Sequence, residues 1–313
     1  MRLRFVLNAD AGTLRALDGA AISRHLRAAA AAAGHEVLGL DLVPASGLQE
    51  ALARSVSGPG EPPDALIVGA GDGTVSAACG LLAGSGILLG ILPLGTMNLL
   101  ARDLGIPLDW RDAAAALMSG TVRRMDVGWL DHGGGPGGGP ASRAFVTLSA
   151  LGLYAHAVAD RERQRRRGQS RKALAMLRAA WRTLRRRPIL RLTLETAAGR
   201  RRVRTASLVV SNNSYRLGFP HLMARDRLDG GRLGLYIARP LSGWGLVRLI
   251  LRAFLGRPAA LPDLHHSEHD ALVIHGRHRL LVAHDGEILT LRPPLAYRIQ
   301  PGALRLLVPA DGA

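Results

Sequence analysis

A glycine-rich stretch, Asp64–Leu82, holds residues whose types and spacing could bind a phosphate group. It opens with the apolar run ALIV, which has the length and composition of a buried strand. Three glycines then alternate with other residues, and a small-residue segment after them predicts a helix. This order brings backbone N–H groups together around an anion, and glycine lets the anion come close. Two interpretations stay open: a phosphate turn, or a plain strand-to-helix turn with Asp72 or Thr74 as N-cap.

A second turn of the same kind follows at once. Ile87–Leu92 is expected to be a strand, Pro93–Thr96 a turn, and Met97–Arg102 the start of a helix. Two phosphate-compatible turns on neighbouring strands are much more specific than one. The sequence contains no GxxxxGK[ST] motif, and Lys172 is its only lysine. Any phosphate must therefore be held mainly by the backbone of these turns.

Two later groups of polar residues could also do chemistry. Asp285-Gly286-Glu287 lies between two expected strands and offers two carboxylates, although an Asp-Gly pair is also a common hairpin turn. His265, His266, Glu268 and His269 have the types of metal ligands, but the HExxH order is missing. Because Pro262 and Asp263 indicate a loop, we interpret this group as surface.

The first half of the chain alternates strands with helices. The expected elements are a strand at Arg2–Leu7, a helix at Leu14–Ala33, a strand at Val37–Val43 and a helix at Gly47–Val56. Such alternation predicts βαβ units and a parallel sheet. Ligands bind beyond the carboxyl ends of the strands in these sheets, where both glycine turns fall.

The second half changes to short strands, which predict a β-sandwich. The low-complexity segment His132–Pro140 is expected to be a hairpin tip near the domain boundary, and Leu246–Leu255 a short amphipathic helix in the core or at a lipid entry. The expected strands are Ala144–Ala150, Ile189–Thr196, Val203–Ser211, Arg232–Ala238, Asp270–His275, Arg279–Ala283, Ile288–Arg292 and Leu304–Val308.

Composition narrows the class of protein. The 313 residues carry 41 Lys and Arg against 24 Asp and Glu, a net charge of +17, which predicts attraction to anionic surfaces. Aromatic residues make up only 4%, which argues against base-stacking platforms for single-stranded nucleic acid. The lone Cys79 excludes an internal disulfide framework and is typical of a reducing cytoplasm. No apolar run approaches a membrane span, and the N-terminal one is too short for a signal peptide.

The basic segment Arg161–Arg187 is expected to be helical from Ser170. Its arginines lie on one stripe and its Leu and Trp residues on another. This pattern suits a membrane surface, and equally a helix packed on the sandwich with solvated arginines.

Together, VGAGDGT and LGILPLGTMNLLARDLGIP resemble the signatures of the diacylglycerol-kinase catalytic domain, the fold shared by bacterial lipid kinases and sphingosine kinases. The resemblance covers nearly the whole chain. Asn8–Gly12 is similar to the family's NPxSG-type nucleotide turn, Leu148–Leu153 to its NxxxGF segment, and Ala283–Glu287 to its DGE motif.

This resemblance implies an ATP-dependent, magnesium-requiring lipid kinase that acts on a diacylglycerol-like or sphingoid-like hydroxyl. It implies Glu287, Asp285 and Asp72 as catalytic residues, with Glu287 favoured as proton acceptor, and Asp72, Asp285 and Asp229 as metal-linked carboxylates. The residues implied to cradle ATP are Asn8, Ala9, Asp10, Ala11, Gly12, Gly69, Ala70, Gly71, Asp72, Gly73, Thr74, Val75, Gly95, Thr96 and Asn98.

Several positions depart from the family pattern. Ala70 replaces a glycine, Ser76-Ala77 stand where Asn-Glu is usual, and Leu99 stands where GTxND has its aspartate. In the DGxL metal loop the ligand aspartate falls on Gly230, one position from Asp229. We therefore expect the structural metal to be lost or bound differently, and the lipid pocket to differ.

The sequence thus predicts an α/β N-terminal domain with an open parallel sheet (1–127), a β-sandwich lipid domain (128–296) and a C-terminal strand returning to the first domain (297–313). The expected setting is the cytoplasm, peripherally at the inner face of the cell membrane. The expected partners are a lipid substrate, an anionic membrane surface and a second copy in a homodimer, without nucleic acid. The alternatives are an NAD kinase-like enzyme and a catalytically weak, membrane-associated nucleotide-binding protein.

Overall fold

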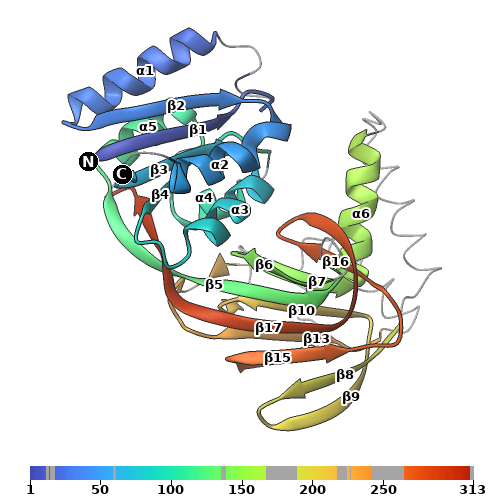
Figure 1. Cartoon of the computed structure of the whole chain (residues 1–313). Helices are drawn as coiled ribbons and strands as arrows, with labels where there is room; N and C mark the ends of the chain where they lie inside the picture. The colour runs from blue at the N-terminus through green and yellow to red at the C-terminus, as the bar shows by residue number, and fades with distance from the viewer. Residues whose placement is uncertain are drawn as a thin grey trace, which may run out of the picture. The chain divides into compact units, whose positions relative to one another are not determined.

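The computed structural model describes residues 1–11, 14, 18–58, 61–96, 98–134, 139–166, 189–216, 224–225, 227–240 and 264–310. The chain forms two compact units (Figure 1). Unit 1 comprises Met1–Val127, Ala144–Thr147 and Gln300–Ala313, and unit 2 comprises Gly128–Arg143 and Leu148–Ile299.

Unit 1 is built on a parallel sheet. Its strand order is β2 (Glu36–Val43), β1 (Arg2–Asn8), β3 (Ala65–Ala70), β4 (Leu88–Pro93) and the end of β17 (Glu287–Val308). The neighbouring strands in this order pair in parallel. All residues of β3 and β4 are buried, as expected for strands covered on both faces. The expected open α/β sheet is confirmed.

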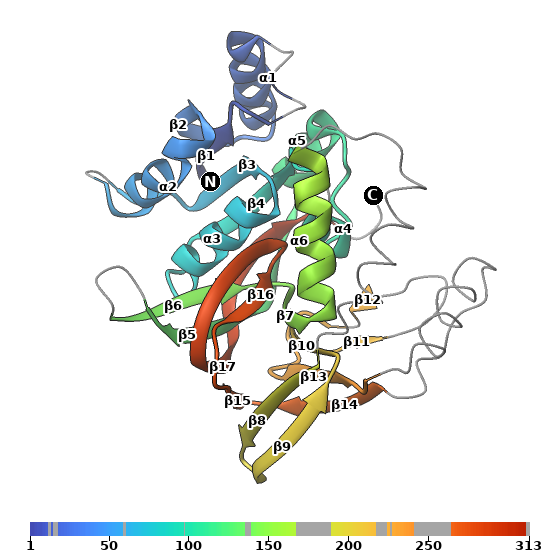
Figure 2. The same cartoon turned by 90° about the vertical axis from the view of Figure 1, so that its right-hand side faces the viewer.

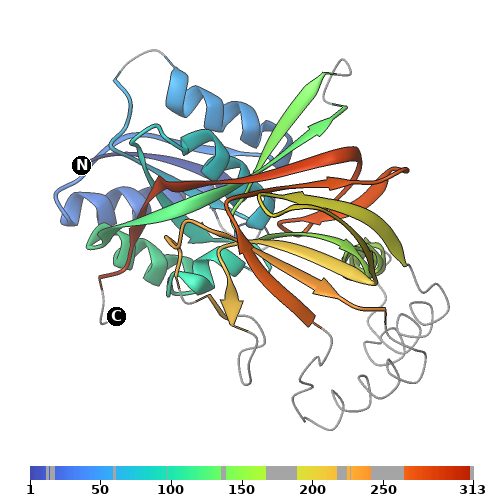
Figure 3. The same ribbon diagram turned by 90° about the horizontal axis from the view of Figure 1, so that it is seen from below.

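Helices cover both faces of this sheet (Figure 3). Helix α1 lies beside α5 on one side, and α2 beside α3 on the other. The helix expected from Leu14 is described from Gly19, because Asp18 is its N-cap and accepts a hydrogen bond from Ala20 N at 3.0 Å. The helical elements of unit 1 are α1 (Gly19–Ala32), η1 (Ala45–Gly47), α2 (Leu48–Ser57), α3 (Asp72–Leu82), α4 (Leu99–Asp103) and α5 (Trp110–Met118).

Unit 2 is rich in antiparallel strands, and the expected β-rich second domain is confirmed. One layer runs β14-β13-β10-β7-β16-β17, and the other runs β9-β8-β15-β17 with β5 and β6 beyond. Its elements are β5 (Thr121–Gly133, which begins in unit 1), β6 (Pro140–Phe145), β7 (Leu148–Gly152), α6 (Leu153–Arg166), β8 (Leu190–Thr196), β9 (Gly199–Thr205), β10 (Ser207–Asn212), β11 (Tyr215–Arg216), β12 (Ala224–Arg225), β13 (Leu233–Ala238), β14 (Leu264–His269), β15 (Ala271–His275) and β16 (Leu280–His284).

Strand β17 takes part in both layers of unit 2. Glu287–Leu291 pairs with β16, and Leu295–Arg298 pairs with β15. Pro293 and Pro294 lie between these two stretches, where the chain changes partner. Proline has no N–H to donate to a ladder, so it fits a point at which the ladder is interrupted.

Two expected elements of unit 2 were wrong. The single strand Val203–Ser211 is two strands that break at Ala206, because Thr205 Oγ1 hydrogen-bonds to backbone oxygens there and accepts from Ser207 N at 3.1 Å. His265–His269, expected in a loop, belongs to β14 and pairs with β13. The hairpin tip expected at His132–Pro140 does join paired strands, β5 and β6.

Other expectations fall partly outside the described residues. The expected helix Leu246–Leu255 lies outside them altogether. In the basic segment, Arg161–Arg166 ends α6, and residues 167–187 lie outside the described part. No helix in the described ranges is long and apolar enough to cross a membrane.

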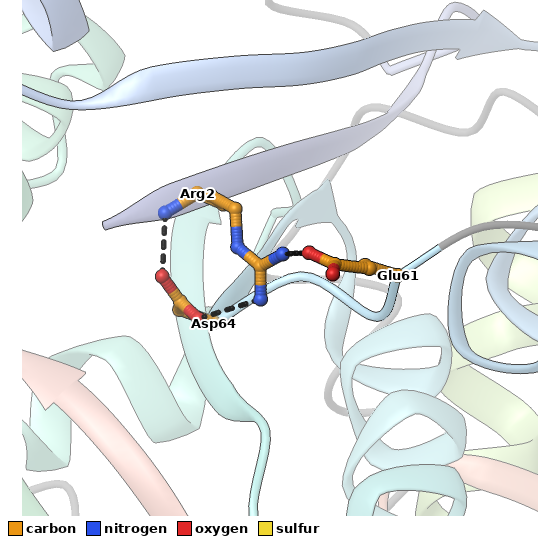
Figure 4. Close-up of polar contacts among 3 residues, drawn as sticks. All are labelled: Arg2, Glu61 and Asp64. Atoms are coloured by element: carbon orange, nitrogen blue, oxygen red, sulfur yellow. Dashed lines mark hydrogen bonds and ion pairs between the residues drawn. The ribbon is translucent and has the colours of Figure 1, made fainter.

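An ion-paired cluster ties β1 to the residue before β3 (Figure 4). Arg2 N donates to Asp64 Oδ2 at 2.7 Å, and the Arg2 guanidinium binds both Asp64, at 3.3 Å, and Glu61. In return Asp64 N donates to Arg2 O at 2.9 Å. The backbone hydrogen bond from Arg2, and then its side chain, lower the pKa of Asp64 below 3.8.

This lowered pKa predicts how stability depends on pH. A carboxyl group with a depressed folded-state pKa stabilises the fold above its unfolded pKa and loses that effect as pH falls through the folded value. Asp64→Asn should therefore lower Tm by about 2 °C at neutral pH, and the difference should shrink below about pH 4. Thermal unfolding across pH measures it. Glu61→Gln is the control and should change Tm less, because that side chain is 82% exposed. A Tm difference between Asp64→Asn and the parent that does not change with pH would contradict the prediction.

Candidate functional site

Three turns lie along the carboxyl edge of the unit 1 sheet. The register pairs Leu7 of β1 with Gly69 of β3, and Gly69 with Leu92 of β4, so these strands end at nearly the same level. The structure thus brings together the three segments that the sequence assigned to a nucleotide: the turn after Asn8, the turn at 70–75, and the turn at 95–98.

The two glycine turns pack backbone against backbone. A Cβ atom added at Gly95 would lie 2.7 Å from Gly71 Cα and 2.8 Å from Asn98 Oδ1, closer than side chains tolerate. Gly69 has a different role, because an added Cβ would lie 2.5 Å from a methyl group of Leu7. Gly69 therefore allows close packing inside the unit, whereas Gly95 allows the two turns to meet.

Asp72 joins these turns through its carboxylate. Oδ1 accepts a hydrogen bond from Leu99 N at 2.6 Å, and Oδ2 accepts one from Asn98 N at 3.1 Å. The alternative interpretation, in which Asp72 or Thr74 is the N-cap of the helix that follows, is wrong. The N-cap of α3 is Gly71, which makes no side-chain cap hydrogen bond. Asp72 instead satisfies the first N–H groups of α4, which have no partner within that helix.

Asn98 fixes the second turn from within. Its backbone is left-handed, with φ 49° and ψ 48°, a conformation that asparagine tolerates better than most residues. Its Oδ1 accepts from Gly95 N at 2.9 Å, and its Nδ2 donates to Gly95 O at 2.9 Å and to Pro93 O at 3.3 Å. Leu99 contributes only its backbone N–H to Asp72, so the departure from the family aspartate leaves this bridge intact.

The turn after β1 is held by similar contacts. Asn8 Oδ1 accepts from Asp10 N at 2.9 Å, Asp10 Oδ2 accepts from Ala45 N at 2.9 Å, and Ala9 N donates to Val43 O at 2.8 Å. Gly12, also assigned to the nucleotide, lies outside the described residues.

Within unit 2, Asp285 and Glu287 have different surroundings. Asp285 and Gly286 form a two-residue hairpin turn with φ of 44° and 88°, the signs of a type I′ turn. Asp285 is 3% exposed; its Oδ1 accepts from Leu148 N at 3.1 Å, and its N–H donates to Leu148 O at 2.9 Å. Glu287 is exposed, and its carboxylate makes no hydrogen bond or ion pair within the described part of the chain. Asp285 thus positions the start of β7, while Glu287 is accessible to a substrate.

The loop before β13 does not fit the metal site of the resembled family. Asp229 is half exposed and forms an ion pair with Arg227 at 3.2 Å, so its carboxylate is already paired with an arginine side chain. A Cβ added at Gly230 would lie 2.7 Å from Asn213 Oδ1, a buried oxygen with no hydrogen-bond partner. Asn213 was not among the expected site residues, although its place in a polar Asn-Asn-Ser turn was a signal. No group of three or more His, Cys, Asp or Glu side chains that could hold a metal occurs among the described residues.

These features define a protein with an α/β unit, whose glycine turns meet at one sheet edge, and a β-sandwich unit. Two family models match the same chain. The diacylglycerol kinase catalytic domain matches residues 2–130, and the YegS C-terminal NAD kinase beta sandwich-like domain matches residues 150–308.

Individual proteins agree with the family models. A diacylglycerol kinase of Mycobacterium tuberculosis is 31% identical over 254 residues, covering 80% of this chain and 78% of its own. A protein of Chromohalobacter salexigens described as "Probable lipid kinase YegS-like" is 26% identical over 255 residues, covering 79% and 77%. A crystal structure of a diacylglycerol kinase from Bacillus anthracis superposes with a TM-score of 0.66 at 17% identity, covering 100% of this chain and 98% of that one; it supports the fold alone. The chain belongs to the diacylglycerol kinase family of lipid kinases.

The Asp72 bridge can be tested without knowing the lipid substrate. Asp72→Ala leaves two backbone N–H groups of α4 without their acceptor and should cost about 1 kcal/mol of stability. It should also weaken ATP binding at least about tenfold, because the two turns separate. Calorimetric titration with ATP and thermal unfolding measure the two effects.

Asp109→Ala is the matched control. Asp109 caps α5 in the same unit and accepts from Arg111 N at 2.8 Å, so its loss should cost similar stability. ATP affinity should be unchanged in this variant. Equal effects of both substitutions on ATP binding would contradict the proposed role of the bridge.

Proposed function

We propose that this protein is an ATP-dependent lipid kinase that transfers the γ-phosphate of Mg-ATP to the hydroxyl of a diacylglycerol-like or sphingoid-like lipid. The proposed location is the cytoplasm, where the protein would associate peripherally with the inner face of the cell membrane. The observation that carries the proposal is the bridge from Asp72 to Asn98 and Leu99, which joins two glycine turns at the sheet edge of a diacylglycerol kinase family chain.

Backbone groups would hold the nucleotide. The N-terminus of α3 lies at the turn that Asp72 joins to the next one, and a helix N-terminus attracts phosphate through its N–H groups and dipole. The only lysine of the chain lies in the segment outside the described residues, and no P-loop lysine motif is present. The phosphates would therefore rest on main-chain donors from the turns at 70–75 and 95–98.

Asp72 could supply a carboxylate ligand for magnesium. Mg²⁺ in phosphoryl-transfer sites keeps several waters and takes one or two carboxylates plus phosphate oxygens. The Asp72 oxygens accept hydrogen bonds from Asn98 N and Leu99 N, and the same carboxylate would be the ligand offered to the ion, directly or through a water. The bound ion would neutralise charge on the transferring phosphoryl group. Asp229, already paired with Arg227, is not part of this proposal.

Glu287 would act as the general base. The lipid hydroxyl oxygen forms the new bond to the γ-phosphorus while the bond to the β–γ bridging oxygen breaks and ADP leaves. The hydroxyl proton passes to the Glu287 carboxylate, which its exposure makes accessible. Asp285 would hold the hairpin in place through its hydrogen bond from Leu148 N.

Glu287→Gln tests this assignment. The substitution keeps size and polarity but removes the proton acceptor, so kcat should fall by about 100-fold or more, while ATP affinity stays at the parent value. A phosphorylation assay with labelled ATP and a bacterial lipid extract, read by mass spectrometry, measures the rate and identifies the lipid.

Glu268→Gln is the control for this test. Glu268 is an exposed carboxylate on β14 of the same unit, and glutamine keeps an oxygen acceptor for Ser214. Its kcat should match the parent. Full activity of Glu287→Gln would rule out the assigned base. Phosphorylation of NAD but of no lipid would favour the NAD kinase-like alternative, and ATP binding without any turnover would favour a catalytically weak binding protein.

A further inference from the structure

The β8–β9 hairpin of unit 2 presents an unusual charge pattern. The two strands pair antiparallel, and β9 lies at an edge, since among the described strands it pairs only with β8 (Figure 2). Directly opposed residues of antiparallel strands lie on the same face of the sheet. The register therefore assigns every side chain of the hairpin to one of two faces.

One face of the hairpin holds its buried leucines, and the other carries four of its five arginines. Leu192 and Leu194 are buried, and they lie opposite Val203 and Arg201. The other face holds Arg191 opposite Arg204, Thr193 opposite Arg202 and Glu195 opposite Arg200; its four arginines are all exposed. We call Arg191, Arg200, Arg202 and Arg204 the hairpin arginine face.

Glu195, the acidic residue on this face, is already paired with other side chains. Glu195 binds Arg200 Nη2 at 2.9 Å and His275 Nε2 at 2.7 Å, and these hydrogen bonds, that from His275 first, lower its pKa. Arg191, Arg202 and Arg204 form no ion pair within the described residues. Three positive charges therefore face solvent together.

This arrangement opposes the folding of the hairpin. Arg191 and Arg204 are directly opposed, and like charges in that position destabilise a sheet. An edge strand can be protected from aggregation by a single charge, so protection alone does not require three on one face. Where a sequence breaks a local rule without structural gain, a binding function is the expected reason. An anionic surface would relieve the repulsion.

We propose that the hairpin arginine face docks the protein onto an anionic phospholipid surface. Its charge is complementary to that of a leaflet rich in anionic lipids, to which basic side chains near the surface are attracted. Leu190–Thr205 contains no aromatic residue that could stack on bases, which favours phospholipid over single-stranded nucleic acid. The inference extends the proposed lipid kinase function, because a docked enzyme meets its substrate at the membrane.

The test measures binding to vesicles and does not depend on phosphorylation. The full-length parent should sediment with vesicles of phosphatidylglycerol mixed with phosphatidylcholine, and not with phosphatidylcholine alone. The triple variant R191Q/R202Q/R204Q should bind the anionic vesicles roughly a hundredfold more weakly. The triple variant R191K/R202K/R204K, which keeps the charges, should bind within about threefold of the parent.

A charge-matched variant controls for net charge. The variant R24Q/R27Q/R123Q also removes three positive charges, but from exposed positions on α1 and β5. It should bind the anionic vesicles nearly as tightly as the parent. Equal loss in both Gln triples would overturn the proposal, as would a parent that ignores anionic vesicles. Duplex DNA that displaces the parent from vesicles at equal phosphate concentration would also overturn it, in favour of a nucleic-acid face. Hairpin-dependent vesicle binding without phosphorylation of any lipid would support the docking face while removing the proposed activity.

Discussion

The carboxylate of Asp72 holds the carboxyl edge of the α/β sheet in one arrangement. Beyond the last residues of β3 and β4 no ladder hydrogen bonds remain to fix the following turns relative to each other. Asp72 replaces the ladder with two hydrogen bonds from α4, at 2.6 and 3.1 Å, and Gly71 meets Gly95 where a side chain would not fit. Because hydrogen bonds to a charged acceptor are short and strong, this bridge fixes the spacing between the two turns.

A second carboxylate, that of the buried Asp285, also accepts a hydrogen bond from a distant backbone N–H. Asp285 turns inward and accepts from Leu148 N, so its hairpin is tied to the first residue of β7. Glu287, two residues later, is exposed at the start of β17. An acceptor already committed to a backbone donor is suited to positioning, whereas an uncommitted one is suited to proton transfer. Two residues that are nearly adjacent in the sequence therefore have different surroundings, which supports the different roles proposed for them.

The sequence predicted those elements whose cause is local. Continuous apolar runs marked β3 and β4, and the Asp-Gly pair marked the two-residue turn before β17. It could not predict the partner of Asp72, because Asn98 and Leu99 lie 26 and 27 residues away and come close only when two strands pair in parallel. The break at Ala206 depends on the Thr205 hydroxyl meeting the distant Ala238 O. The arginine face, likewise, required the register of β8 and β9.

The departures from the family pattern have unequal consequences, because the two sites use different parts of a residue. At Leu99 the bridge needs only a backbone N–H, which any residue except proline supplies, so the loss of the side-chain carboxylate leaves the geometry unchanged. At Gly230 a metal would need the side chain itself, and glycine leaves Asn213 Oδ1 buried without a partner. The bridge between the unit 1 turns is thus independent of the side chain at position 99, while the loop before β13 offers no side-chain ligand at position 230.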